Sequence, residues 1–208
     1  MRLGFYGGSF DPLHLGHLIL ADSARIAFNL DKIIFVPACI SAHKQGEKPV
    51  DGRLRYAMVK SAVEENPFFE ADDWEIQRGG VSRSIDTLYY LKKKYAHRLK
   101  ENKISVIIGD DLVEEFYRWK NCEELAENFD ILVGRRDNPD FSTENFFISG
   151  NKRFPCRFFQ NPRISISSGE VRSAITNGQS WQYFVPQNVR ETIIANGLYG
   201  AKEGQNGF

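Results

Sequence analysis

Short apolar runs alternate with longer amphipathic stretches in the first part of the chain. Residues 3–6 and 32–36 have the length and residue types of buried strands. Residues 15–28, between them, place apolar side chains at helical spacing. Strand, helix and strand in this order form the crossover unit of a parallel sheet. The pattern therefore predicts an α/β fold from the first residues onward.

The same alternation continues to the other end of the chain. Further helical patterns cover residues 51–66, 82–94 (beginning at Ser82 or Ser84), 112–116, 122–128, 167–175 and 186–197, the last with Pro186 at its first position. Further strand patterns cover residues 68–76 (one or two short strands), 104–108 and 131–133, and residues 157–159 and 164–166 bracket a last strand region. Residues 38–52 resemble a loop at the carboxyl end of a strand, and residues 135–155 favour no element. We expect one α/β domain over residues 1–199, with a mainly parallel sheet flanked by helices, and a flexible tail at 200–208.

Composition excludes several classes of protein. The 208 residues carry a formal net charge of zero, so nothing favours nucleic acid or an anionic membrane as a partner. The apolar run that follows Met1-Arg2 is too short for a signal peptide. No apolar run reaches the ~18 residues of a membrane span. The three cysteines form no C-x-x-C pair and predict reduced, structural thiols. We expect a soluble, cytoplasmic protein.

Residues 7–17 gather small residues and imidazoles where the first strand meets the first helix. Gly7 and Gly8 lack Cβ atoms and allow the backbone to approach a ligand closely. The start of the following helix offers unpaired N–H groups to an anion. His14 and His17, three residues apart, would share one face of its first turn. They can cap the helix or sit in the core, but beside a glycine turn we favour hydrogen bonds to a phosphate.

Two common nucleotide signatures are absent: the chain has no G-x-x-x-x-G-K-[ST] loop, and its first glycines lack the G-x-G-x-x-G spacing. Instead, residues 8–17, Gly-Ser-Phe-Asp-Pro-Leu-His-Leu-Gly-His, resemble the H-x-G-H signature of the nucleotidyltransferase superfamily. Their G-S-F-D-P-x-H-x-G-H form resembles that of the bacterial nicotinate mononucleotide adenylyltransferases. The resemblance implies a Rossmann-like nucleotidyltransferase fold with the site at the carboxyl ends of the strands.

A second constellation lies near the other end of the chain, at residues 166–172, Ile-Ser-Ser-Gly-Glu-Val-Arg. Ser167 and Glu170 can form a capping box that needs no substrate. The segment also resembles the family motif I-S-S-T-x-x-R, whose helix start and arginine bind ATP phosphates. Gly169 stands where that motif has threonine, so a hydroxyl contact is lost, while Arg172 remains a bidentate phosphate donor.

Weaker matches extend the resemblance over residues 3–199. His43-Lys44 is similar to the family's H-K step, where Lys44 would contact phosphate rather than only solvent. Residues 79–88 are similar to the segment around the nicotinate ring, with Arg83 and Ser84 in place of tyrosine and threonine, although the residues from Ser84 on can simply cap a helix. The final match, Val185-Pro186 with Gly197-Leu198-Tyr199, is structural.

Two further matches concern the end of the 104–108 strand. Gly109-Asp110-Asp111 is similar to the family's G-x-D step, which implies a carboxylate near the ribose or a metal; a cap at the strand end is the alternative. Trp119 corresponds to the tryptophan that lies against the pyridine ring, and it can equally be a core aromatic.

The resemblance implies roles for individual residues. The catalytic residues would be His14, His17, Lys44 and Arg172. ATP would be bound by Gly7, Gly8, Ser9, Phe10, His17, Gly109, Asp111, Ile166, Ser167, Ser168 and Arg172. The mononucleotide would be bound by Ser9, Lys44, Ser84, Asp86, Asp110 and Trp119. No metal site is expected from side chains; Mg²⁺ would accompany ATP and the leaving pyrophosphate.

The implied reaction transfers AMP from ATP to nicotinate mononucleotide, giving nicotinate adenine dinucleotide and pyrophosphate for NAD biosynthesis. A phosphate monoester is already nucleophilic, so alignment and charge stabilisation suffice without a protein nucleophile. Within the superfamily, a pantetheine-phosphate adenylyltransferase or a cytidylyltransferase is the alternative; from another class, a nucleotide sensor without turnover. The sequence leaves nicotinate versus nicotinamide open, as it does a homo-oligomeric state. Arg83 would favour the acid if it reaches the ring.

Overall fold

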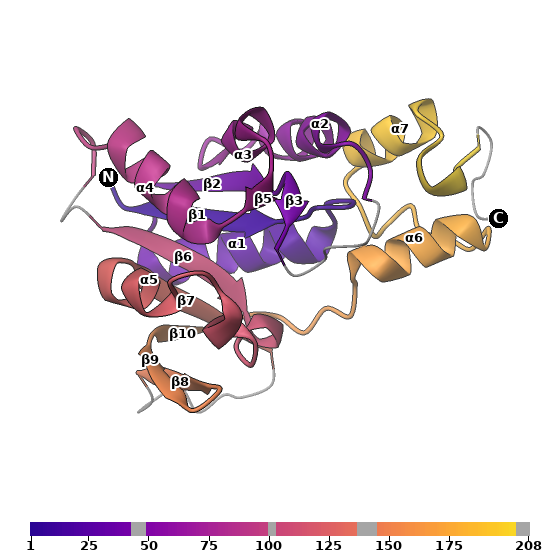
Figure 1. The fold of residues 1–208 in the computed structure, drawn as a ribbon. Helices are drawn as coiled ribbons and strands as arrows, with labels where there is room; N and C mark the ends of the chain where they lie inside the picture. Colours follow the sequence, from indigo (N-terminus) through magenta and orange to yellow (C-terminus); the bar gives the residue numbers. More distant parts are fainter. Residues whose placement is uncertain (43–48, 100–102, 137–144, 203–208) are drawn as a thin grey trace.

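The structure, a computed structural model, describes residues 1–42, 49–99, 103–136 and 145–202. Its centre is a six-stranded sheet in the order β10-β7-β6-β1-β2-β4 (Figure 1), and every neighbouring pair in it is parallel. The strands are β1 (Leu3–Gly8), β2 (Lys32–Pro37), β4 (Phe69–Ala71), β6 (Ile104–Gly109), β7 (Asp130–Arg135) and β10 (Arg157–Gln160). The predicted parallel α/β sheet is confirmed.

The strands are continuously apolar because both faces of the sheet are covered. Successive side chains point to opposite faces, so Ile33 and Phe35 of β2 join one core cluster while Ile34 and Val36 join the other. The first cluster also contains side chains of α1 (Leu15–Phe28), α2 (Gly52–Val63), α6 (Ser168–Thr176) and α7 (Gln187–Ala195). The second contains side chains of α4 (Ser84–Lys94) and α5 (Cys122–Asn128).

Two small sheets extend this framework. β3 (Ile40–Ser41) pairs in parallel with β5 (Val81–Ser82), beside the carboxyl end of β2. β8 (Phe146–Ser149) and β9 (Lys152–Pro155) form an antiparallel hairpin within the region for which the sequence favoured no element. Its aromatic rings, Phe147 and Phe154, pack on Phe116 with centroids 5.2 and 5.0 Å away, which joins the hairpin to the second core cluster.

Several predicted boundaries are wrong. Residues 164–166 form no strand: Asn161 donates the last hydrogen bond to β7, and Pro162 has no N–H with which to continue the ladder. The second half of the 68–76 segment belongs to a helix, α3 (Trp74–Arg78), whose first N–H is held by the carboxylate of Asp72 at 2.8 Å. Each difference follows from one local hydrogen-bonding group.

Smaller differences affect two helices. The 112–116 segment lies between two short 3₁₀ turns, η1 (Asp110–Leu112) and η2 (Phe116–Arg118), rather than in a helix. Pro186 precedes α7 in extended conformation instead of being its first residue. A last 3₁₀ turn, η3 (Leu198–Gly200), leads to the buried Ala201. Of the predicted tail, residues 203–208 lie outside the described residues. In the part of the chain that the structure describes, no helix is long and apolar enough to cross a membrane.

Candidate active site

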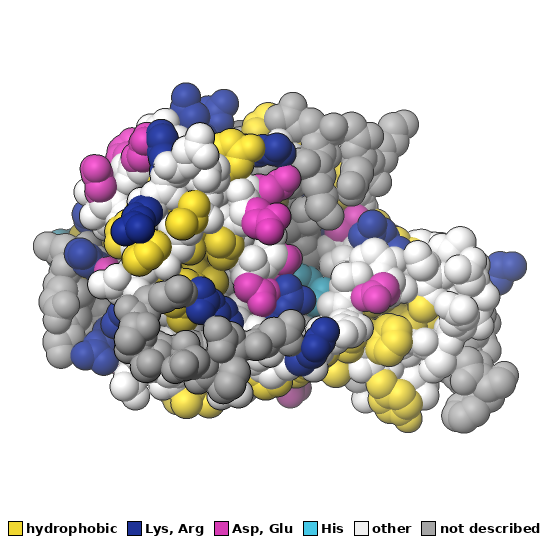
Figure 2. All heavy atoms as spheres, turned by 90° about the horizontal axis from the view of Figure 1, so that it is seen from below, with side chains coloured by type: hydrophobic (Ala, Val, Ile, Leu, Met, Phe, Trp, Pro, Cys, Tyr) yellow, Lys and Arg dark blue, Asp and Glu magenta, His cyan; other side chains and the backbone are white. Residues whose placement is uncertain are grey.

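A cleft of about 910 Å³ opens at the carboxyl ends of the central strands. Its walls include the last residues of β1, Gly109 of β6 and Gly134 of β7, together with the start of α6. Figure 2 shows this face with a hollow that has histidine at its base and both acidic and basic side chains around it. Parallel sheets bind ligands at this edge. The volume is near the upper limit of ordinary small-molecule sites.

The first turn of the cleft is held by the helix that begins near the end of the chain. Arg172 Nη1 donates to the carbonyl of Asp11 at 2.7 Å, and Ser168 Oγ donates to the carbonyl of Pro12 at 2.9 Å. The sequence predicted that both motifs bind phosphate, and the structure brings them into direct contact. The remaining N–H groups of the Arg172 guanidinium lie at the wall of the cleft.

A buried arginine fixes the other side of the same turn. Arg55 of α2 is only 1% exposed. Its guanidinium donates to the carbonyls of Ser9 at 2.6 Å, Val50 at 2.8 Å and Cys39 at 3.1 Å. These three carbonyls belong to the first turn and to both sides of the predicted loop at 38–52. Arg55 therefore joins segments that border the cleft from two directions, a role that the sequence analysis missed.

The imidazoles of His14 and His17 lie face to face, with centroids 3.7 Å apart and planes inclined by 30°. The backbone N–H of His14 donates to Nδ1 of His17 at 3.1 Å. Nδ1 must accept this bond, so in neutral His17 the proton resides on Nε2. Gly16 makes room for the pair, since a Cβ there would lie 3.0 Å from Nδ1 of His14.

Both imidazoles are neutral at physiological pH. Burial lowers the pKa of His14 to about 4, against a smaller opposing effect of the Glu170 carboxylate. Desolvation, reinforced by His14, lowers the pKa of His17 well below its ordinary value. Within the described residues, the buried Nδ1 of His14 has no hydrogen-bond partner. The pair therefore offers N–H donors to an anion rather than a full positive charge, and an anion bound there would raise both pKa values.

Gly7 and Gly8 end β1 rather than forming the turn itself. A Cβ on Gly7 would lie 2.7 Å from the ring of Phe5, and one on Gly8 would lie 3.1 Å from the ring of Phe10. Neither glycine has a positive φ. Their small size is required because aromatic rings pack against the end of the strand, and both half-buried glycines line the cleft.

The predicted capping box is present at the start of α6. Ser167 Oγ accepts a hydrogen bond from the N–H of Glu170 at 3.1 Å, and the Glu170 carboxylate accepts one from the N–H of Ser167 at 2.7 Å. Ser167, Ser168 and Gly169 nevertheless line the cleft, so a structural cap and a ligand wall coincide here. A Cβ on Gly169 would meet only Ser167 Oγ, at 3.8 Å.

An arginine that the sequence analysis did not identify pairs with the two aspartates that follow β6. Arg136 donates from its backbone at 3.2 Å and from its side chain at 2.8 and 2.5 Å to the carboxylate of Asp110, and lies 3.4 Å from that of Asp111. Burial acts to raise the pKa of Asp110, but the Arg136 hydrogen bonds outweigh it and lower the pKa. The Arg-Arg pair directly after a buried strand was the available sequence clue.

These contacts bear on metal binding. Among the described residues, no group of three or more histidine, cysteine, aspartate or glutamate side chains is placed to hold a metal ion. The acidic pair Asp110 and Asp111 has Arg136 as its counter-ion. The donor set of the described chain therefore does not fit a resident divalent ion.

The far end of the cleft is formed by the junction of β5 with α4 and by the η1–η2 segment. Ser82, Arg83 and Ser84 line the cleft in succession, and Trp119 lines the same cleft. The Trp119 ring also packs on Phe116, with centroids 5.1 Å apart, so the core role and a place at the cleft coincide. Behind the junction, Thr87 of α4 donates a hydrogen bond to Glu75 of α3.

Glu75 of α3 is the buried acid at this end. It is 3% exposed, lines the cleft and accepts a hydrogen bond from Thr87 Oγ1. Burial raises its pKa, and hydrogen bonds from Ser82 and Thr87 act against that rise. The sequence analysis did not identify this residue because a lone glutamate in a short amphipathic segment is usually solvent-exposed.

The structure brings together most of the predicted site residues. The residues that line the cleft are Gly7, Gly8, Ser9, Phe10, His14, His17, Ser84, Gly109, Asp110, Asp111, Trp119, Ile166, Ser167, Ser168 and Arg172. Asp86 is not among the lining residues and pairs with Arg78 at 3.2 Å. Lys44 lies outside the described residues. Lining residues that the sequence analysis did not assign to the site include Glu75, Arg118, Lys120 and Arg136.

Comparison with known proteins places the chain among nucleotidyltransferases. The model of the cytidylyltransferase-like family matches residues 5–174. A probable nicotinate-nucleotide adenylyltransferase of Treponema pallidum is 36% identical over 205 residues, which cover 96% of this chain and 99% of the relative. A probable nicotinate-nucleotide adenylyltransferase of Desulfitobacterium hafniense is 36% identical over 203 residues, 95% of each protein.

A solved structure supports the fold. The Plasmodium falciparum nicotinic acid mononucleotide adenylyltransferase complexed with NaAD superposes with a TM-score of 0.70 at 18% sequence identity, covering 95% of this chain and 97% of the other. The predicted Rossmann-like nucleotidyltransferase fold is thereby confirmed.

Proposed function

Because the chain belongs to the cytidylyltransferase-like family, and within it to the nicotinate-nucleotide adenylyltransferases, we propose that its cleft transfers the adenylyl group of ATP to nicotinate mononucleotide. The products are nicotinate adenine dinucleotide and pyrophosphate, and the reaction serves NAD biosynthesis. The relatives that carry this name match nearly the whole chain, including both ends of the cleft. They favour a pyridine mononucleotide over phosphopantetheine or a cytidylyl substrate.

One observation carries the chemistry: two stacked, neutral imidazoles lie in the same cleft as the capped start of α6 and Arg172. A phosphate oxygen of the acceptor attacks the α-phosphorus of ATP, forming the new P–O bond. The bond from the α-phosphorus to the bridging oxygen of the β-phosphate breaks, and pyrophosphate leaves with the electron pair. Because negative charge on the phosphoryl oxygens is redistributed in this step, preorganised N–H donors stabilise the transition state.

The residues divide this work by position. His17 donates from Nε2, since its Nδ1 accepts the bond from the His14 backbone. Arg172 and the cleft-lining backbone of Gly7 and Gly8 bind phosphate oxygens, and the long-range contacts of Arg172 and Arg55 fix the turn that precedes the histidines. Lys44 adds a further cation by resemblance. Each of these groups binds or orients phosphate, and none forms a covalent bond to it.

Mg²⁺ enters this scheme as part of the substrate. ATP and pyrophosphate carry the ion on their phosphate oxygens, which satisfies its preference for oxygen ligands without a protein cage. The pairing of Asp110 and Asp111 with Arg136 is consistent with that assignment. Removal of free Mg²⁺ with a chelator should therefore abolish turnover without lowering the melting temperature of the protein alone.

The decisive assay measures pyrophosphate release from ATP with each acceptor in turn. Nicotinate mononucleotide should give the highest kcat/KM, with nicotinamide mononucleotide, phosphopantetheine and CTP-dependent reactions as comparison arms. Activity only with phosphopantetheine or only with CTP would replace the proposal by another transferase. Tight binding of ATP with no pyrophosphate from any acceptor would instead support a nucleotide sensor.

A further inference from the structure

Arg83 is a cationic residue of the cleft that the reaction scheme does not use. It directly precedes α4, and its carbonyl accepts hydrogen bonds from the N–H groups of Asp86 at 3.1 Å and Thr87 at 3.3 Å. The preceding residue is also held, because Ser82 Oγ accepts a hydrogen bond from the N–H of Cys39 at 2.8 Å. The backbone of Arg83 is therefore fixed, while its exposed side chain lines the cleft.

The carboxylates around this position are already engaged. Among the described residues that line the cleft, Glu75 accepts from Thr87, and Asp110 and Asp111 lie against Arg136. Asp86, three residues along the helix, pairs with Arg78. Within the described chain, the Arg83 guanidinium itself has neither a hydrogen bond nor an ion pair. A guanidinium without an internal partner, at the wall of a ligand cleft, is suited to an anion brought by the ligand.

The arrangement of the cleft indicates which anion this is. The phosphate chemistry belongs to the first turn and α6, whereas Arg83 lies at the start of α4; the two helices lie on opposite sides of the carboxyl end of β1 (Figure 1). A pyridine mononucleotide has its phosphate at one end and the ring substituent at the other. Trp119, which the resemblance places against the pyridine ring, lines the same cleft as the histidines and Arg83, so a mononucleotide with its phosphate at the histidines can direct its ring substituent toward the β5–α4 junction.

We propose that Arg83 is the residue of this chain that selects the acid form of the acceptor, by pairing its guanidinium with the pyridine carboxylate. This inference rests on the proposed function and deepens it. Nicotinate provides a planar anion that matches the two-pronged guanidinium, whereas the amide of nicotinamide provides no charge and only one acceptor oxygen. A site built to pair with a charged group discriminates strongly against an analogue without it.

The test compares kcat/KM for nicotinate and nicotinamide mononucleotide in wild type, Arg83→Gln and Arg83→Lys. In Arg83→Gln the preference for the acid should fall roughly 10- to 100-fold, mostly through KM for nicotinate mononucleotide. Arg83→Lys keeps the charge without the planar fork, so its preference should lie between the other two. Lys93→Gln, which removes one exposed charge from the same helix outside the cleft, is the matched control and should leave the preference unchanged.

Two results would overturn the assignment. An equal loss of kcat/KM for both acceptors in Arg83→Gln would mean that Arg83 contacts a group that the two acceptors share, such as the phosphate. An unchanged ratio with unchanged kcat/KM would show that Arg83 does not contact the acceptor. Because the side chain of Arg83 is exposed and unpaired among the described residues, the variants should have the melting temperature of the wild type. A failure of the proposed function is separate: wild-type protein would then release no pyrophosphate with either mononucleotide.

Discussion

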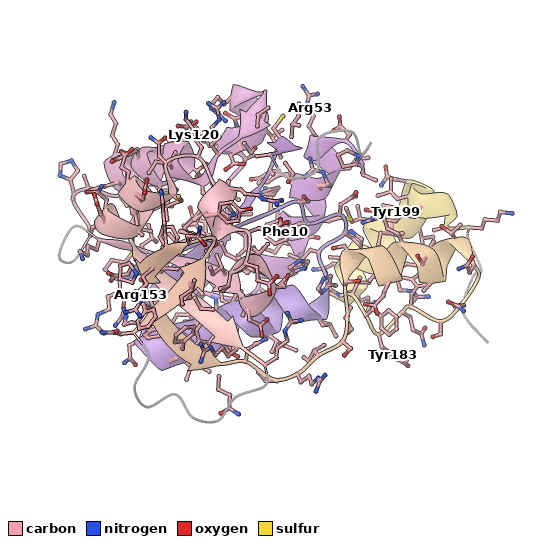
Figure 3. The ribbon with its side chains drawn as sticks, turned by 60° about the horizontal axis from the view of Figure 1, so that its bottom comes forward. Phe10, Arg53, Lys120, Arg153, Tyr183 and Tyr199 are labelled. Atoms are coloured by element: carbon pink, nitrogen blue, oxygen red, sulfur yellow. The ribbon has the colours of Figure 1, made fainter. Side chains whose placement is uncertain are left out.

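The two ends of the cleft are fixed in different ways. At the histidine end, carbonyls of the first turn accept hydrogen bonds from Arg55, Ser168 and Arg172, side chains 46 to 161 residues away in sequence. Tyr199 adds a hydrogen bond to the carboxylate of Asp11, and Figure 3 shows it on the side of the molecule formed by the last helices. At the Arg83 end, the carbonyl of Arg83 accepts hydrogen bonds from Asp86 and Thr87 in the same helical turn, and Ser82 accepts one from the N–H of Cys39, 43 residues away. The contacts that hold the histidine end therefore reach farther along the chain, up to 161 residues, than those at the Arg83 end.

This difference has a physical reason. Stabilising a transition state requires donors that are already in place, and side chains from several elements hold a turn more rigidly than local bonds can. Selecting an acceptor needs only a suitable group at the wall, which a single substitution can change. The comparison therefore predicts that changes at the histidine end affect turnover or stability, whereas changes at the Arg83 end affect acceptor choice.

The largest effect is expected from His17→Ala. Removing one preorganised donor typically costs on the order of 100- to 1,000-fold in turnover, and the same loss in kcat is expected here. The half-buried side chain makes ring contacts but, among the described residues, no long-range hydrogen bond, so the protein should remain folded. The measurement is kcat for pyrophosphate release together with a circular dichroism spectrum. His97→Ala, at an exposed position, is the control. Near-normal turnover in His17→Ala would contradict the proposed role of the histidine end in the reaction.

Arg55→Met tests whether the distant contacts fix the turn. Three buried carbonyls would lose their donor, and a buried acceptor left unpaired is costly, so we expect destabilisation of about 3 kcal/mol in chemical denaturation. Turnover should also fall at temperatures where the variant is folded, because Ser9 and Cys39 are no longer joined. Val59→Ala, on the same helix in the apolar core, should cost stability and leave kcat unchanged. Equal kcat in the two variants would argue that Arg55 only stabilises the fold.

The pH dependence of stability tests the buried imidazoles. The pKa of His14 is about 4 in the folded protein and near 6.5 when unfolded, so between these values only the unfolded chain binds the proton. The free energy of unfolding should therefore fall as pH drops from about 6.5 to 4, by ~3 kcal/mol for this group, and His17 acts in the same direction.

Carboxyl groups titrate in part of the same range, so the difference between variants is the useful quantity. His14→Gln should unfold with a shallower pH dependence than wild type, whereas His97→Gln should retain the wild-type slope. Parallel curves for wild type and His14→Gln, measured by urea unfolding from pH 7 to 4, would mean that His14 is not kept neutral by burial.

The contrast between the two ends also explains what the sequence could predict. Strands, the parallel sheet and the first turn follow from local patterns, because alternating apolar runs and the spacing of His14 and His17 are visible within a few residues. The hydrogen bonds of Ser168 and Arg172 to the first turn were not expected, whereas the meeting of the two motifs at one ligand was. Resemblance, rather than periodicity, supplied that long-range information.

Other features could not be predicted because they depend on partners far away in sequence. Arg55 occupies a helix position that an exposed arginine would suit equally well, and only the meeting of Cys39, Val50 and Ser9 buries it. Arg136 is recognisable as an acid partner only when β6 and β7 lie side by side. The β8–β9 hairpin is joined to the core by Phe147 and Phe154, which pack on the ring of Phe116 from another segment.

The smallest effect is expected at Gly169, which stands where the resembled motif I-S-S-T-x-x-R has threonine. A Cβ there has room, since its nearest neighbour would be Ser167 Oγ at 3.8 Å, and the position lines the cleft. Gly169→Thr should therefore supply a hydroxyl to the ATP phosphates and lower KM for ATP by roughly 2- to 10-fold, the worth of one hydrogen bond. Gly169→Val has the same shape without the hydroxyl and should not lower KM. If both variants lower KM for ATP to the same extent, the gain comes from a stiffer helix start. If Gly169→Thr raises KM for ATP, the glycine is needed for the close approach of the triphosphate to the backbone.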